Sequence, residues 1–135
     1  MKDQSMLEIL RKGELEIKQE LACIGLELSG EQLKELYQVQ QMALQRYQWV
    51  ETREDRLFDI LRPFLKSPYM AVQTYVSLLK QVIVLYYRIR SSVDWHVSDE
   101  ILCDTLYEEY LLHHGEIDRP LASAILRRLH TKGEE

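Results

Sequence analysis

The sequence predicts a single all-α domain of five or six helices, and three observations support this prediction. Apolar residues recur at intervals of three and four, the spacing of one helix face, in segment after segment. Gly and Pro fall almost only where these segments end, and residues 69–114 contain neither. A chain of 135 residues can also bury one core without a metal or a disulfide. We therefore expect residues 1–135 to form one helical domain.

Two helices are expected in the first part of the chain. The first spans about residues 4–22, and Gly13 inside it costs about 1 kcal/mol relative to Ala, so its first turns should fray. Ser29 and Gln32 have the spacing of a capping box, which predicts a second helix over about 30–49. The apolar seam of the first helix, interrupted at Glu14, consists of Leu7, Leu10, Ile17, Leu21 and Ile24.

The middle of the chain should contain a short helix and then the central one. Thr52 resembles an N-cap for a third helix over about 53–66, which Pro63 should kink or end. A long helix over 70–92 is apolar nearly all round in its second half and should be the central element. The run 82–87 could also form a buried strand, but no turn signal flanks it, which favours the helix. The centre of the core is expected at Leu79, Val82, Ile83 and Tyr86.

Two further helices should complete the bundle. Ser98 resembles the N-cap of the fifth, and Gly115 should end it. The sixth is expected over about 118–130, with disordered tails at 1–3 and 131–135.

Charge and composition exclude several classes of function. The net charge of −5 repels phosphate backbones and anionic lipid, so neither nucleic acid nor membrane is expected as a partner. The most apolar stretch, 67–87, is too interrupted by polar residues to span a bilayer. A charged segment over 11–20 stands where a secretory signal would be apolar, so we expect a cytoplasmic protein. Cys23 and Cys103 are expected as reduced thiols in or near the core.

The sequence contains no recognisable catalytic, cofactor or metal motif. His113 and His114 adjoin a helix end, but neither the spacing of zinc proteases nor that of di-iron bundles is present. Histidines in a last turn can instead complement the negative end of the helix dipole. No glycine-rich phosphate loop or nucleophile elbow occurs. We therefore predict no catalytic residue, no cofactor and no metal.

The positive signals favour a non-enzymatic protein-interaction module. Acidic residues recur every four positions on the fifth helix, forming a ridge that could be a solvated face or could receive a basic partner. Aromatic residues near helix ends are further contact candidates. The interrupted seam of the first helix would also fit self-association as a homodimer. The candidate interaction residues are Trp49, Trp95, Glu100, Asp104 and Glu108.

The alternative is a small-molecule-binding or catalytic bundle. Helical bundles build such sites from side chains on facing helices, here the fourth and the fifth. The candidate lining consists of Tyr86, Tyr87, Tyr107, Glu109, Tyr110 and His113.

Five short motifs resemble a known family. They are Gly25-Leu26-Glu27-Leu28-Ser29 with Glu31-Gln32, Trp49-Val50-Glu51, Phe64-Leu65-Lys66-Ser67-Pro68-Tyr69-Met70, Tyr86-Tyr87, and Val97-Ser98-Asp99-Glu100. Their order is similar to that in a family of small all-helical bacterial proteins, mainly from Firmicutes, that carries a domain-of-unknown-function label. Where that family has a glycine-containing stretch, this chain has Thr52-Arg53-Glu54-Asp55. The resemblance implies a bacterial cytoplasmic helical domain and assigns no activity.

Overall fold

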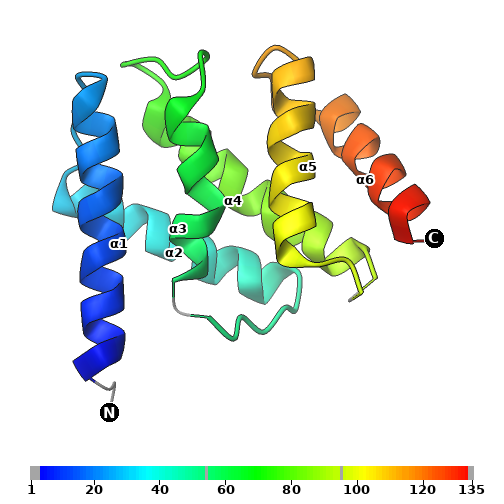
Figure 1. The fold of residues 1–135 in the computed structure, drawn as a ribbon, viewed down its shortest axis with the longest axis horizontal. Coiled ribbons are helices and arrows are strands. Elements are labelled where there is room, and N and C mark those ends of the chain that lie inside the picture. The colour runs from blue at the N-terminus through cyan, green and yellow to red at the C-terminus, as the bar shows by residue number, and fades with distance from the viewer. Residues whose placement is uncertain (1–3, 54, 95, 134–135) are drawn as a thin grey trace.

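The computed structural model describes residues 4–53, 55–94 and 96–133, and it confirms the all-α fold class (Figure 1). Its described residues form six α-helices and one 3-10 helix, with no strand. In chain order these are α1 (Gln4–Cys23), α2 (Gly30–Arg46), α3 (Arg56–Leu61), the 3-10 helix η1 (Arg62–Lys66), α4 (Tyr75–Ser92), α5 (Asp99–Leu112) and α6 (Arg119–Gly133).

Helix α4 is the centre of the molecule, as predicted. It packs against α2, α3, α5 and α6. In Figure 1, α4 runs behind α3 and α5, and α2 runs behind α1 and α3. The residues expected at the centre of the core are buried, with Leu79, Val82 and Ile83 fully inaccessible and Tyr86 nearly so. The run 82–87 is helical, so the strand alternative is wrong.

Local capping signals in the sequence correspond to real hydrogen bonds. The Ser29 hydroxyl accepts from the Gln32 amide at 3.1 Å, and the Gln32 side chain accepts from the Ser29 amide at 2.9 Å. The Ser98 hydroxyl accepts from the backbone amide of Ile101 at 3.1 Å. Gly115 follows α5 with a φ of +79°, the left-handed conformation that glycine adopts without strain.

The third helix begins later than predicted, because a different side chain satisfies the backbone there. Thr52 is not the N-cap: α3 starts at Arg56. Instead Glu51 Oε2 accepts from the backbone amides of Thr52 and Arg53 at 3.1 and 3.4 Å. The predicted effect of Pro63 is confirmed, since the α-helix becomes the 3-10 helix η1 at Arg62.

Three other helix boundaries also differ from the prediction. Helix α2 ends at Arg46 rather than at residue 49. Helix α4 starts at Tyr75 rather than 70, and Val72 lies 67% exposed in a turn although its spacing fits the core stripe. Helix α6 continues to Gly133, so residues 131–133 are helical rather than part of a tail. Residues 1–3 and 134–135 lie outside the described residues.

Gly13 has a packing role that the propensity argument missed. It is buried, and a Cβ placed there would lie 2.2 Å from Cδ2 of Phe58, so the absence of a side chain lets α1 approach α3 closely. The seam of α1 faces the interior: Ile17 and Leu21 are buried. Ile24 is half exposed, and Cys23 is exposed rather than in the core.

Candidate functional site

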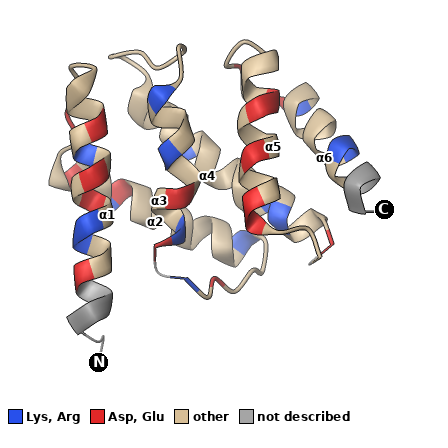
Figure 2. Ribbon diagram, in the orientation of Figure 1, with Lys and Arg blue, Asp and Glu red and all other residues tan. Residues whose placement is uncertain are grey.

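The predicted interaction residues on α5 are exposed to solvent, whereas Trp49 is partly buried. Figure 2 shows acidic residues on successive turns of α5. Glu100, Asp104 and Glu108 are all exposed, and Glu108 pairs with Arg128 at 2.6 Å. The Trp49 ring is partly buried beneath the guanidinium of Arg90, 5.4 Å from the ring centroid. Trp95 lies outside the described residues.

The six side chains proposed to line a pocket between α4 and α5 are engaged in packing instead. Tyr86, Tyr87 and Tyr110 are buried, and their hydroxyls bond to Asp99, Glu51 and Ser67 respectively, each within 2.9 Å. The Tyr107 ring stacks on that of Tyr110.

The two remaining members of that set lie at the α5–α6 contact. Glu109 is buried and pairs with Arg128 at 3.2 Å. His113 Nδ1 lies 2.8 Å from the backbone oxygen of Glu109. None of the six lines either of the two surface hollows described next.

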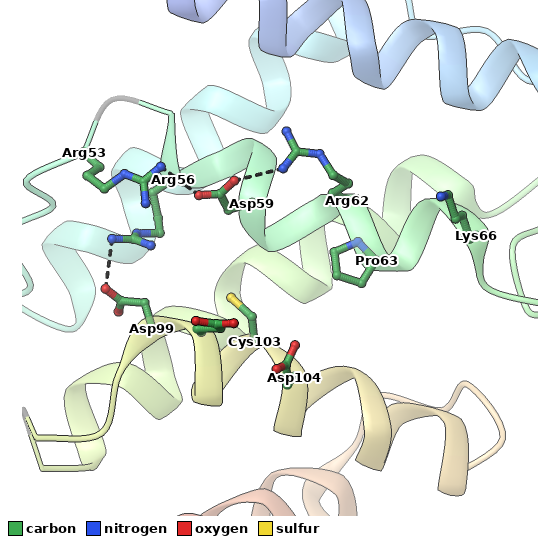
Figure 3. A pocket seen from close by; sticks show the side chains of 10 residues that line it. Arg53, Arg56, Asp59, Arg62, Pro63, Lys66, Asp99, Cys103 and Asp104 are labelled. Carbon is green, nitrogen blue, oxygen red and sulfur yellow. Dashed lines mark hydrogen bonds and ion pairs between the residues drawn. The ribbon is translucent and has the colours of Figure 1, made fainter.

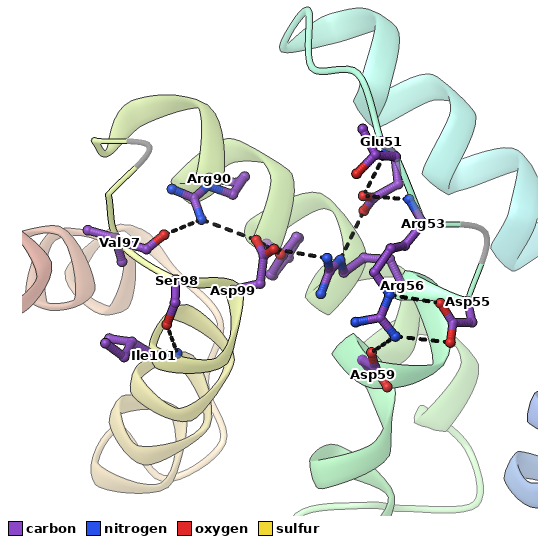
Figure 4. A network of polar contacts seen from close by, with 12 residues as sticks. Glu51, Arg53, Asp55, Arg56, Asp59, Arg90, Val97, Ser98, Asp99 and Ile101 are labelled. Atoms are coloured by element: carbon purple, nitrogen blue, oxygen red, sulfur yellow. Dashed lines mark hydrogen bonds and ion pairs between the residues drawn. The ribbon is translucent and has the colours of Figure 1, made fainter.

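A buried polar network joins α3, α4 and α5 (Figure 4). Asp99 accepts from Arg90 at 3.1 Å and is paired with Arg56 Nη2 at 2.9 Å. Arg90, only 2% exposed, also donates to the backbone oxygens of Val97 at 2.6 Å and Asp94 at 2.8 Å. The single guanidinium therefore closes the α4–α5 loop onto α4.

The same network continues to α2 through Glu51. Its Oε1 atom lies 3.4 Å from Arg56 Nε and accepts from the Tyr87 hydroxyl at 2.9 Å, and that hydroxyl in turn accepts from buried Gln40. Burial raises the pKa of the Tyr87 phenol, so it remains a neutral donor. Gln40, which interrupts the apolar stripe of α2, is thus one end of the network.

A cleft of about 460 Å³ lies between α3–η1 and α5 beside this network (Figure 3). One wall carries Arg53, Arg56, Arg62 and Lys66, and the other carries Asp99, Glu100, Cys103 and Asp104. We call this hollow the α3–α5 cleft.

Most charges in the α3–α5 cleft are neutralised within the chain. Asp59 lies 3.0 Å from both Arg53 and Arg62, and Arg56 is held by Glu51 and Asp99. Burial raises the pKa of the Cys103 thiol to about 12, so the sulfur stays protonated and is a weak nucleophile at neutral pH. Within the described residues, no three His, Cys, Asp or Glu side chains are arranged to hold a metal. The charged residues of the cleft therefore serve mainly to hold α3 and η1 against α5.

A second hollow of about 510 Å³ lies on α2, α4 and the start of α6, and its floor is apolar. A smaller hollow of about 370 Å³ adjoins it and shares Met42, Arg46 and Val84, so the two form one groove. Met42 is 67% exposed. We call this continuous hollow the α2–α4 groove; its apolar lining is Val39, Met42, Ala43, Tyr47, Val84, Leu85 and Ile117.

The rim of the α2–α4 groove is basic. It carries Arg46, Lys80, Arg88 and Arg119, against one carboxylate, Asp118, which accepts from the Leu121 amide at the start of α6. Lys80 pairs with Glu35 at 3.3 Å. Among the described residues, the guanidinium groups of Arg46, Arg88 and Arg119 have no carboxylate partner.

Sequence reasoning missed this groove although two signals pointed to it. Val84 and Leu85 form a second apolar side on the long helix, opposite its core stripe, and Lys80 and Arg88 stand one turn before and after Val84. In the structure Leu85 belongs to the core, and only the half-buried Val84 of this pair reaches the floor of the groove between the two cations.

The comparisons with known proteins extend over nearly the whole domain. Residues 14–132 match a family of unknown function, DUF6323. This chain belongs to that family. The match includes α2 to α5, half of α1 and most of α6, and therefore every residue of the cleft and the groove. No curated protein and no solved structure matches the chain.

Proposed function

We propose that this DUF6323 protein is a non-enzymatic helical interaction module that binds a protein partner in the α2–α4 groove. The observation that supports this most is the apolar floor with its 67% exposed Met42, edged by arginines that have no carboxylate partner among the described residues. Burying a methionine and its apolar neighbours is the usual source of affinity at an interface, and arginine is enriched there. The acidic ridge on α5 stays a second, untested contact surface.

Self-association is a weaker form of the same proposal. The α1 seam that suggested a homodimer packs inside the protomer through Ile17 and Leu21. A symmetric dimer through the groove would bring Arg88 and Arg119 of one copy against the same residues of the other, which like charge disfavours. A different protein is therefore the favoured occupant.

We also infer a bacterial cytoplasmic setting. Cys23 and Cys103 are both free thiols on separate helices, as expected in a reducing compartment. Within the described residues, no helix is long and apolar enough to span a bilayer. The Firmicutes origin rests on the motif resemblance alone.

Site-directed photo-crosslinking in the native cell tests the proposal. A photoreactive residue, p-benzoylphenylalanine, replaces Met42 in the groove or Ile101, a 42% exposed apolar residue on α5, as the control. We expect a discrete adduct from position 42 that is absent at 101 and is lost when Arg88→Glu and Arg119→Glu are added. An adduct of twice the chain mass would replace the partner with a second copy. Adducts from 101 alone would overturn the assignment to the groove.

A further inference from the structure

The shape of the α2–α4 groove fits a short helix. Its lining on α2 falls at positions 39, 42, 43, 45 and 46, and on α4 at 80, 81, 84, 85 and 88. The rise along α4 from position 80 to position 88 is about 12 Å, so the groove holds roughly two helical turns of an occupant. An extended segment would leave its backbone groups unpaired over the apolar floor, whereas a helix satisfies them internally.

The charge of the groove is opposite to that of the chain as a whole. The protein carries −5, yet the groove lining holds four basic residues and one carboxylate. Arg88 and Arg119 are exposed and have no carboxylate partner among the described residues, so an occupant could pair with them without first breaking an ion pair. The Arg46 guanidinium lies over the Tyr47 ring, 5.5 Å from its centroid, which fixes it at the rim.

We propose that the occupant is an acidic amphipathic helix of the partner protein. Its apolar residues, spaced by three and four, would lie on Val39, Met42 and Val84, and its carboxylates would reach Arg88 and Arg119. This inference rests on the proposed function and adds the chemistry of the partner. Nucleic acid is disfavoured because the floor offers apolar side chains where phosphates would need donors, and the overall charge repels it.

The test uses three synthetic peptides of about four helical turns each. The first has a Leu stripe flanked by Glu, the second replaces each Glu with Lys, and the third keeps Glu but replaces the stripe with Gln. Binding to the full chain is measured by fluorescence anisotropy, and the site is mapped by methyl chemical shifts of Met42, Val84 and Leu85. We expect the first peptide to bind at least about tenfold more tightly than either of the other two. Its affinity should decrease when the salt concentration is raised from about 0.05 M to about 0.3 M.

Charge reversal on the protein provides the matched control. Arg88→Glu should weaken the acidic peptide and strengthen the Lys peptide. Lys34→Glu makes the same change in net charge on an exposed face of α2 outside the groove, and should alter neither. If both substitutions changed peptide binding equally, the preference for the acidic peptide would come from the net charge of the protein and not from the groove. That result would overturn the inference.

The remaining outcomes separate this inference from the proposed function. Binding of the Glu and Lys peptides with equal affinity, or of none while position 42 still crosslinks to a partner, would overturn the acidic helix and leave the interaction module intact. Failure of both the peptides and the crosslink would reject both. Displacement of the Glu peptide by anionic phospholipid vesicles or an oligonucleotide at comparable concentration would replace a protein occupant with that ligand.

Discussion

The α3–α5 cleft and the α2–α4 groove are both lined by charged residues, but their charges are engaged differently. In the cleft, arginines from α3 and η1 face carboxylates from the same chain, and most of these charges form ion pairs at about 3 Å. In the groove, three arginines without such partners among the described residues surround an apolar floor on which Met42 is exposed. Charges that are paired internally support the fold, whereas unpaired charges beside an apolar floor are available to another molecule.

The largest expected effect is that of replacing Arg90, and Arg88, two positions earlier on α4, provides the comparison from the groove. Arg90→Met should lower the free energy of unfolding by about 3 to 5 kcal/mol, because the carbonyls of Val97 and Asp94 lose a charged donor and Asp99 loses one of its two cations. Arg88→Met should change it by less than about 0.5 kcal/mol, since that side chain is exposed at the groove. Urea denaturation of the two variants compares the regions directly. Equal losses would mean that the groove arginine is also structural.

The second prediction concerns Gly13, which sets the distance between α1 and the helix that forms the basic wall of the cleft. Helix propensity alone predicts that Gly13→Ala stabilises the protein by about 1 kcal/mol. The buried ring of Phe58, 2.2 Å from the new Cβ, predicts instead a loss of about 1 to 3 kcal/mol through overpacking. Lys18→Ala compared with Lys18→Gly, at an exposed position inside α1, measures the propensity effect by itself. Stabilisation by Gly13→Ala in thermal melts would show that α1 can move away from α3.

Local features of this fold could be predicted from the sequence because their causes are local. The capping box of Ser29 and Gln32 and the Ser98 cap depend on residues three positions apart. The central burial of Ile83 follows from a helix that is apolar on nearly all sides. Pro63 ends regular α-helical geometry because it lies beyond the first turn of the helix that begins at Arg56.

Features that depend on the path of the chain could not be predicted. The donors of Arg90 find the Val97 and Asp94 carbonyls only because the α4–α5 loop folds back over that side chain. Glu51 replaces the expected Thr52 cap because it is held by Arg56 and Tyr87 from other helices. The groove likewise depends on where the segment from Ile117 to Arg119 lies beside α2 and α4, which the spacing of residues within α4 does not specify.

The third prediction is that alkaline pH destabilises the cleft side of the molecule. Burial raises the pKa of the Cys103 thiol from 9.0 to about 12 and raises that of the Tyr86 phenol. Between pH 9 and 12 the unfolded chain therefore binds fewer protons than the folded one, so stability is complete below pH 9 and falls as pH rises.

Urea denaturation between pH 8 and 10.5 measures this slope. Cys103→Ser removes one titrating group from the cleft, so its slope should be shallower by up to about 1.4 kcal/mol per pH unit, the value for one proton. An unchanged slope would show that the thiol ionises as readily in the folded protein as in the unfolded chain. Arg88→Met, a change in the groove, leaves both Cys103 and Tyr86 in place and should retain the full slope of the parent protein.

The smallest expected effect lies on the acidic ridge of α5. This helix carries both a carboxylate that pairs within the chain, Glu109, and an exposed one, Asp104. Asp104→Ala should change the free energy of unfolding by less than about 0.5 kcal/mol, because this carboxylate is exposed and no described residue pairs with it. Glu109→Ala, five residues further on, should cost more, since it leaves Arg128 Nη1 without its buried acceptor at 3.2 Å. If Asp104→Ala proved the more destabilising of the two in urea melts, the exposed acidic residues on the α5 side of the cleft would also stabilise the fold. The contrast between paired and available charge would then hold only for the α2–α4 groove.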